Sequence, residues 1–264
     1  MMFEPRVAVA SLSGESDASW ADAAAPHVGA AFLGGVALDD ASQAAARELV
    51  ARGRSEFLAD DPVAFVSDQL ASLAGFDGED RFAAVNVRAT SSAPIREVAA
   101  VCADRSAGVE INAHCRQDEL CAVGCGETLL RDTDRLAAYV AAAAESGAPV
   151  GAKVRAEIDG VDLPSLAVAL ADAGADWLHV DAMDSEAAVA DVAAAAPELF
   201  LVANNGVRDR ETATEYLDYG ADAVSVGRPS DNPAVLRRVR TAVDDWFGGR
   251  EDAAESGDES GVSA

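Results

Sequence analysis

Lysine is almost absent from this sequence: Lys153 is the single lysine, beside nineteen arginines, among 264 residues. The 20 basic residues face 46 acidic ones, which gives a formal net charge of −26. Such acidity excludes nucleic-acid binding through a broad basic face, although a local basic site stays open. Carboxylates compete well for water at high salt, where ions screen their mutual repulsion. We therefore interpret the composition as that of a halophilic, cytoplasmic protein.

Long apolar runs and disulfide-type cysteine patterns are missing as well. No apolar stretch reaches about 18 residues, the length at which a membrane span is predicted, so we expect no membrane partner. Four cysteines without a basic-then-apolar leader favour a reduced intracellular chain over a disulfide scaffold. The spacing of Cys115, Cys121 and Cys125 does not match a zinc or iron–sulfur site, so we predict no metal.

Short β-branched apolar runs alternate with longer alanine-rich segments of helical spacing. Several runs are apolar on both faces, as strands buried in a parallel sheet are. The eight predicted strands are Val7–Leu12, Ala30–Gly35, Phe82–Arg88, Gly108–Asn112, Val150–Arg155, Trp177–Asp181, Phe200–Asn204 and Ala223–Gly227.

The segments between these strands predict helices. They are Pro62–Leu73, Pro94–Asp104, Thr133–Ser146, Leu163–Ala173, Ser185–Ala196, Arg210–Tyr219 and Pro233–Trp246, with room for two helices in Asp39–Phe82. Eight βα units in this length predict a (β/α)8 TIM barrel over residues 1–247, and an open doubly wound sheet is the alternative. Residues 248–264 are rich in Gly, Ser and acids without apolar periodicity, so we predict a disordered acidic tail.

Two glycine-containing sequences follow the last two predicted strands. In a barrel, Asn205-Gly206 and Gly227-Arg228 would be neighbours at the end where active sites form. Backbone amides exposed by glycine, together with one guanidinium, suit a phosphate monoester. The sequence Gly124-Cys125-Gly126 is a weaker signal and predicts a turn into the next helix.

Lys153 and Cys115 are the strongest candidates for chemistry. Lys153 lies in an apolar strand, and a compact ammonium suits a point contact to a ring carbonyl or nitrogen, or Schiff-base formation. Cys115 follows a strand, and Arg116 beside it tends to lower a thiol pKa, so this residue could act as an acid or a nucleophile. The roles of His179 and Asp181 stay open.

Taken together, these motifs resemble the FMN-dependent dihydrouridine synthase family, particularly a short archaeal branch, and more distantly dihydroorotate dehydrogenase. The resemblance covers about Val7 to Trp246. The family's first-strand flavin loop is similar to Ala10–Asp17, and its Asn-x-Gly-Cys-Pro motif is similar to Asn112–Arg116. Its Val-Lys-x-Arg strand is similar to Ala152–Arg155.

The resemblance implies a non-covalent FMN and a pyrimidine substrate, either uridine in tRNA or a free ring. It implies that Cys115 protonates one carbon of a uracil-type double bond while reduced FMN delivers hydride to the other. An external donor such as NADPH would reduce the flavin, although the chain has no dinucleotide fingerprint. The implied cofactor-binding residues are Ser11, Leu12, Asn86, Asn112, Lys153, Asn205, Gly206, Gly227 and Arg228.

The sequence departs from the family pattern near these positions. His114 and Arg116 replace the Gly and Pro beside the cysteine, and Asp181–Met183 stands in place of a His-x-Arg sequence. We find no counterpart after Trp246 of the helical domain that grips tRNA, so we expect flavin binding to survive better than tRNA modification. A flavin-independent lyase or isomerase using Lys153, and a barrel that has lost catalysis and serves as a binding partner, are the other functions left open.

Overall fold

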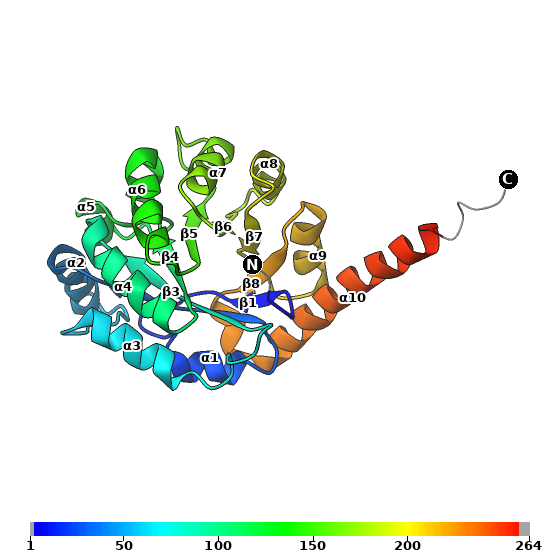
Figure 1. Ribbon diagram of the computed structural model, residues 1–264, viewed down its shortest axis with the longest axis horizontal. Coiled ribbons are helices and arrows are strands. Elements are labelled where there is room, and N and C mark those ends of the chain that lie inside the picture. The colour runs from blue at the N-terminus through cyan, green and yellow to red at the C-terminus, as the bar shows by residue number, and fades with distance from the viewer. Residues whose placement is uncertain (1–2, 259–264) are drawn as a thin grey trace.

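The computed structural model describes residues 3–258, with side chains through Arg250. Eight parallel strands follow one another in chain order, and β8 pairs back with β1, so the sheet closes into a barrel. Figure 1 shows helices arranged around these strands, which confirms the predicted (β/α)8 barrel. The strands are β1 (Val7–Val9), β2 (Ala30–Ala37), β3 (Phe82–Arg88), β4 (Gly108–Asn112), β5 (Val150–Arg155), β6 (Trp177–Asp181), β7 (Phe200–Asn204) and β8 (Ala223–Val226).

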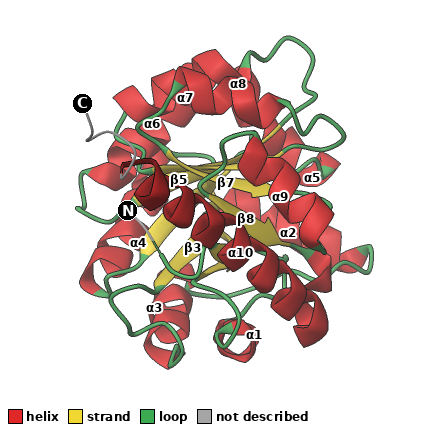
Figure 2. Ribbon diagram, turned by 90° about the vertical axis from the view of Figure 1, so that its right-hand side faces the viewer, coloured by secondary structure: helices red, strands yellow, loops and turns green. Residues whose placement is uncertain are grey.

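Helices form the outer layer of the barrel, as Figure 2 shows. Aspartates begin several of them, and the Asp39 carboxylate accepts a hydrogen bond from the Ser42 amide at the start of α2. Such caps satisfy backbone amides that have no partner inside the helix. The helices are α1 (Ala18–Ala24), α2 (Asp40–Ala51), α3 (Pro62–Ser72), α4 (Ser92–Asp104), α5 (Asp118–Ala122), α6 (Thr133–Ala144), α7 (Leu163–Asp172), α8 (Ala188–Ala195), α9 (Arg210–Asp218) and α10 (Pro233–Asp258), with short 3₁₀ helices η1 (Gly126–Arg131) and η2 (Arg228–Asp231).

Several element boundaries differ from the sequence predictions, and those of β1 and α10 bear on the site and the tail. β1 ends at Val9 instead of Leu12, because the Leu12 amide donates to the Ser16 hydroxyl and the chain turns towards the top of the barrel. α10 runs to Asp258, so its helical backbone continues beyond Gly248, where the predicted tail begins. Residues 259–264 of that predicted tail lie outside the described residues.

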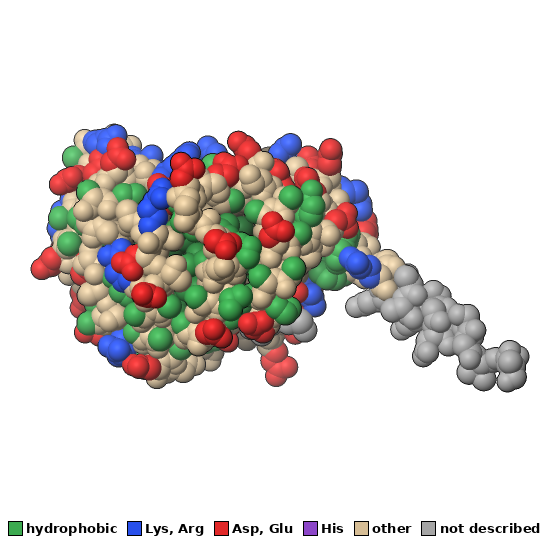
Figure 3. Space-filling view, turned by 90° about the horizontal axis from the view of Figure 1, so that it is seen from above, with side chains coloured by type: hydrophobic (Ala, Val, Ile, Leu, Met, Phe, Trp, Pro, Cys, Tyr) green, Lys and Arg blue, Asp and Glu red, His purple; other side chains and the backbone are tan. Residues whose placement is uncertain are grey.

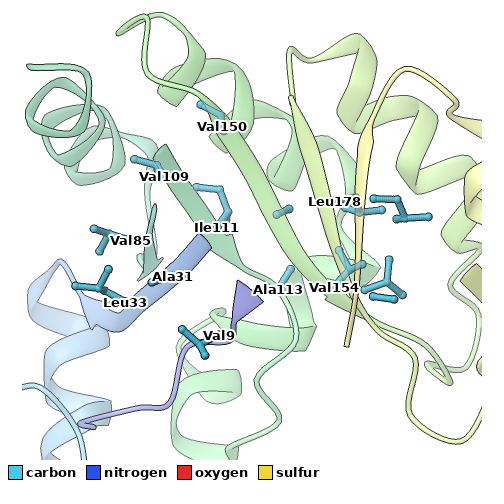
Figure 4. Packing of buried hydrophobic residues seen from close by; sticks show 14 of the residues in the cluster. Val9, Ala31, Leu33, Val85, Val109, Ile111, Ala113, Val150, Val154 and Leu178 are labelled. Atoms are coloured by element: carbon cyan, nitrogen blue, oxygen red, sulfur yellow. The ribbon is translucent and has the colours of Figure 1, made fainter. Parts of the chain in front are cut away.

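The larger hydrophobic core lies between the strands and the helices. Outward-facing strand side chains such as Val9, Leu33, Val109, Val154 and Leu178 are buried there (Figure 4). Burial of one such aliphatic side chain contributes roughly 1.5–3 kcal/mol. This shell fixes each strand, so the inward-facing residues two positions apart are held at defined heights inside the barrel.

Aromatic side chains fill the lower interior, at the N-terminal ends of the strands. Phe82 and Trp177 pack edge to face with their ring centroids 5.4 Å apart. Phe32 and Phe200 complete the layer, and all four belong to one buried cluster. A Cβ atom on Gly151 would lie 2.2 Å from the Trp177 indole, so glycine is required where this ring crosses β5. The lower end of the barrel is therefore closed by packed side chains.

None of the described helices combines the length and apolarity that a membrane crossing requires. The face drawn in Figure 3 carries acidic side chains spread among arginines and small apolar patches. The acidity of the sequence is thus distributed over this surface, and does not form one block.

Candidate active site

A cavity of about 370 Å³ opens at the C-terminal ends of the strands. Lys153 of β5 lies in its wall, together with the loops that follow β1, β7 and β8. This is the end at which TIM barrels build their active sites. The lining residues are Ala10, Ser11, Leu12, His114, Lys153, Asp181, Asn204, Asn205, Gly206, Val207, Arg208, Gly227, Arg228 and Pro229.

The loops after β7 and β8 form one side of this cavity. Asn205 has a φ of +101° and Gly206 a φ of +67°, so this loop has a backbone conformation that side chains rarely adopt. The Asn205 side-chain amide donates to the Met183 carbonyl at 2.7 Å, and the Tyr216 hydroxyl donates to the Asn205 carbonyl at 3.0 Å. Gly227 faces open space, with no atom within 4 Å of where a Cβ would stand. The loops are therefore fixed by side chains while their backbone stays accessible.

Lys153 reaches the cavity from the inside of the barrel. The residue is 2 % exposed and lies between Asn112 and His179 in the strand register. Burial lowers the pKa of its ammonium, and the negative charges of Glu110 and Asp181 oppose that change. No hydrogen bond or ion pair of its ammonium occurs in the described part of the chain, so this group is available to a ligand.

Glu110, His179 and Ser225 form a hydrogen-bonded row across the barrel below the cavity. His179 Nδ1 lies 2.8 Å from a Glu110 oxygen, and His179 Nε2 lies 2.7 Å from the Ser225 hydroxyl. All three side chains are fully buried. Asn86 donates to the other Glu110 oxygen at 2.7 Å, and Asn204 donates to the Ser225 hydroxyl at 2.8 Å. With Asn86 and Asn204, the row connects five strands, β3, β4, β6, β7 and β8, and supports the floor of the cavity.

The charges in this row follow from burial. Burial lowers the pKa of His179, and the nearby ammonium of Lys153 lowers it further, so the imidazole is neutral. Burial alone would raise the pKa of the Glu110 carboxyl. Hydrogen bonds from His179 and Asn86 and the positive charge of Lys153 outweigh this effect, so the pKa is lowered. We conclude that Glu110 is an ionised acceptor of the His179 Nδ1 proton, and that Lys153 supplies the balancing positive charge.

The Cys115 loop is held from both sides. Its amide donates to the Asn112 side-chain oxygen at 3.2 Å, and its carbonyl accepts from the Glu127 amide at 2.8 Å. A Cβ on Gly126 would lie 2.1 Å from the Cys115 carbonyl oxygen, so only glycine permits this approach. Gly126 begins η1, which confirms the predicted turn in this sequence. The glycine-rich turn therefore positions Cys115.

Cys115 lies in the wall of a second cavity of about 350 Å³. The second cavity shares part of its lining with the first, so the two adjoin at the mouth of the barrel. The shared residues are Ser11, His114, Asp181, Asn205 and Arg228. Arginines dominate the rest of the second lining. They are Arg54, Arg88, Arg116 and Arg155.

The structure brings most residues of the predicted site together. Asn112 and Cys115 line the second cavity, and Asn86 lies below both cavities, where it joins Glu110 to Asn112. Cys125 is buried among apolar side chains. The remaining predicted residues line the first cavity, namely Ser11, Leu12, Lys153, Asn205, Gly206, Gly227 and Arg228.

Sequence reasoning missed Glu110, Ser225 and Arg54. The first two could have been found from strand periodicity, since Glu110 lies two residues before Asn112 and Ser225 two before Gly227, on the same inward face. Arg54 lies between α2 and α3, and no local pattern indicates that this segment reaches the barrel mouth. His179 was noted without a role, and the structure places it in the buried row.

The residues present fit a bound FMN. The first cavity combines open backbone at Gly206 and Gly227, an exposed guanidinium at Arg228 and a buried ammonium at Lys153. Those groups match a phosphate at one end and a polar ring edge at the other. Within the described residues, no three His, Cys, Asp or Glu side chains are grouped to hold a metal ion.

Comparison with solved structures supports the fold. DHODH from Eimeria tenella in complex with ferulenol superposes with a TM-score of 0.69 at 14% identity, over 94% of this chain and 83% of that one. The ligand-free type DHODH from the same organism gives a TM-score of 0.57 at 16% identity, over 72% of this chain and 68% of that one. At these identities the likeness establishes the barrel fold.

Sequence comparison establishes the family. An uncharacterized protein of Methanocaldococcus jannaschii is 26% identical over 235 residues, which cover 85% of this chain and 89% of that protein. The family model for dihydrouridine synthase matches residues 53–256, most of the barrel. This chain therefore belongs to the dihydrouridine synthase family, whose members are FMN-dependent oxidoreductases that act on pyrimidine-type substrates.

Proposed function

We propose that this protein reduces the C=C bond of a uracil ring, with Cys115 as the general acid. The observation that supports this most directly is the pair of adjoining cavities: one is lined by Lys153 and the phosphate-type loops, the other by Cys115. A flavin in the first cavity and a pyrimidine in the second would meet at the shared residues. Uridine in RNA is the substrate we propose, and a free pyrimidine is the alternative.

Bound FMN, when reduced, supplies a hydride to one carbon of the double bond. Cys115 Sγ–H gives its proton to the other carbon, so the ring gains two hydrogens and the thiolate recovers its proton from water. The Asn112 side chain and the Glu127 amide hold the Cys115 backbone while this occurs. Lys153 would place a positive charge against the bound flavin, and Gly206, Gly227 and Arg228 would hold its phosphate. An external donor, for which we propose NADPH, restores reduced flavin.

Release of FMN and single-turnover oxidation test this function. Denaturation of the purified protein should release a molecule with the absorption bands and mass of FMN. Reduced protein mixed anaerobically with a uridine-containing RNA, or with uridine, should regain the oxidised flavin spectrum. Cys115→Ala should slow this step by about 10²–10⁴-fold, the usual contribution of a general acid.

Cys102→Ala is the matched control, because Cys102 is buried in α4 and lines neither cavity. It should keep the wild-type rate. A colourless protein that releases no flavin would refute the proposed function. Equal rates in Cys115→Ala and wild type would refute the role of the thiol and leave flavin chemistry in place.

We propose a salt-rich cytoplasm as the setting for this activity. The net charge of −26 makes folding compete with self-repulsion. Salt at ~1 M shortens the screening length to about 3 Å and removes most of that repulsion. Thermal unfolding in 0.1 M and 2 M KCl would test this, with a higher midpoint expected in the stronger salt.

A further inference from the structure

The second cavity concentrates positive charge in a protein that is otherwise acidic. Five of its lining residues are arginines, and Asp181 is the only acidic residue in that lining. The chain as a whole has 46 acids against 20 bases. A negatively charged ligand approaching this protein is repelled over most of the surface, so a site for such a ligand requires a local excess of this kind.

Two of these arginines have protein partners. Arg88 pairs with Glu56 at 2.6 Å and Arg155 pairs with Glu127 at 3.0 Å, and both guanidinium groups are buried. The Nε atoms of Arg88 and Arg155 are buried and have no hydrogen-bond partner among the described residues. These two side chains form a rigid wall, and their charges are largely compensated.

Arg54, Arg116 and Arg228 are different. All three are exposed, and none pairs with a carboxylate in the part of the chain that the structure describes. The positive charge of Arg54 helps to lower the pKa of Glu119, but Glu119 pairs with Arg52. Arg228 also lines the first cavity, where it belongs to the flavin phosphate side. Arg54 and Arg116 line the Cys115 cavity and not the first cavity. Arg54 also lines a further surface hollow, together with Glu15, but no ion pair joins these two described residues.

His114 adds a neutral polar group to the same wall. Burial and the positive charges of Lys153 and Arg88 lower its pKa well below the usual value, so it adds no positive charge here. Its Nδ1 atom has no hydrogen-bond partner within the described residues. The cavity thus offers one neutral ring nitrogen beside two free guanidinium groups, a combination that suits a phosphorylated polar ring better than a bare base.

We infer that Arg54 and Arg116 form a substrate phosphate site, separate from the flavin phosphate site at Arg228. The substrate is then a uridine that carries a phosphate, either a mononucleotide or a unit of an RNA strand, rather than a free base or nucleoside. This inference rests on the proposed function for the identity of the ring. The phosphate requirement itself rests on the two arginines and can be tested alone.

Binding to the oxidised FMN-loaded protein tests the site. Uridine, uridine 5′-monophosphate and a short oligouridylate would be titrated calorimetrically at 0.1 M KCl, into wild type and into the Arg54→Gln/Arg116→Gln double variant. We expect at least one phosphorylated ligand to bind wild type about 10–100-fold more tightly than uridine does. That ratio should fall to about 1 in the double variant, while the affinity for uridine stays the same.

Arg105→Gln is the matched control for net charge. Arg105 is exposed at the C-terminal end of α4, at the opposite end of the barrel, so this variant should keep the full ratio. If the mononucleotide binds more tightly than uridine, a terminal phosphate is sufficient for recognition. If only the oligouridylate binds more tightly than uridine, the site recognises a phosphodiester. Equal binding of all three ligands to wild type would overturn the inference, as would a ratio that survives in the double variant.

The same samples separate this inference from the proposed function. Reduced protein would be mixed with each ligand, and the return of the flavin absorption recorded. Arginine-dependent binding with no flavin oxidation by any ligand would refute the proposed reaction and leave the phosphate site standing. Equal oxidation by uridine and its phosphorylated forms in all variants would support the reaction and overturn the phosphate site.

Discussion

The two ends of the barrel interior are built from the same strands yet have opposite character. At the lower end the inward positions carry Phe82, Trp177 and Phe200, packed without a polar partner for the indole nitrogen. Two residues further along β6, and at matching heights on β4 and β8, the inward positions carry His179, Glu110 and Ser225. Strand periodicity alone thus allows one sheet to hold a packed core below a polar site.

The two ends contribute differently to stability. Aromatic packing below removes a large apolar area from water and leaves one buried donor, the Trp177 indole N–H, without a partner among the described residues. Above, burial of the Glu110 carboxylate is tolerated because Asn86 and His179 donate hydrogen bonds to it and the positive charge of Lys153 lies nearby. We conclude that the aromatic end stabilises the fold, whereas the polar groups at the other end reduce its stability and form the cavity floor. Substitutions at the two ends should separate these roles.

The largest loss of stability should come from the aromatic end. Trp177→Ala removes the largest fully buried side chain and should lower the free energy of unfolding by about 3–5 kcal/mol. Urea unfolding monitored by far-UV circular dichroism would measure this change. FMN affinity at low urea should stay near that of wild type, because the ring lies below the site. Trp246→Ala in α10 is the control, and its half-buried ring should cost less. A similar loss for both would contradict the assignment.

A smaller loss is expected at the polar end. Glu110→Gln keeps the shape but removes the charge that accepts from His179 and balances Lys153, so we expect a loss of about 2–3 kcal/mol. The same variant should weaken FMN binding, which Trp177→Ala should not. Glu145→Gln is the control, because Glu145 pairs with Arg96 at the surface and such pairs contribute under ~1 kcal/mol. Unchanged FMN affinity in Glu110→Gln would disconnect the row from the site.

The smallest effect concerns pH. Burial lowers the pKa of His179 from its usual 6.5. Below about pH 6.5 the unfolded chain therefore binds a proton at His179 that the folded chain does not bind. Stability should therefore fall as the pH drops below about 6.5, by up to ~1.4 kcal/mol per pH unit for this group.

Unfolding midpoints between pH 7.5 and 5.5 would measure this slope. His179→Gln should flatten it, and His27→Gln, at a more exposed position, should change it less because water screens that site. Identical slopes for wild type and His179→Gln would show that folding does not change the pKa of His179.

The sequence was sufficient for the fold and for one side of the site. The strand runs are continuous and apolar, so all eight were located, and β3 to β7 have the predicted bounds. The loops at Asn205 and Gly227 were identified because glycine exposes backbone amides that can hold a phosphate. Lys153 stood out by composition, and its burial beside these loops matches the predicted arrangement.

The other side of the site depends on tertiary contacts that no local pattern reveals. Arg54 reaches the mouth because the segment after α2 is held by the Glu56–Arg88 ion pair and by a bridge between Val36 and Phe57. Asn86 was expected at the flavin ring, and only the register of β3 against β4 shows that it also donates a hydrogen bond to Glu110. The predicted contact of Asn86 with FMN stays a prediction.

The aromatic layer around Trp177 has one further consequence. It closes the barrel below, so ligands enter and leave the two adjoining cavities at the C-terminal ends of the strands. A product must therefore leave by the route through which the substrate entered before another ligand can bind. Under the proposed function, the electron donor and the pyrimidine would therefore enter one after the other by the same route.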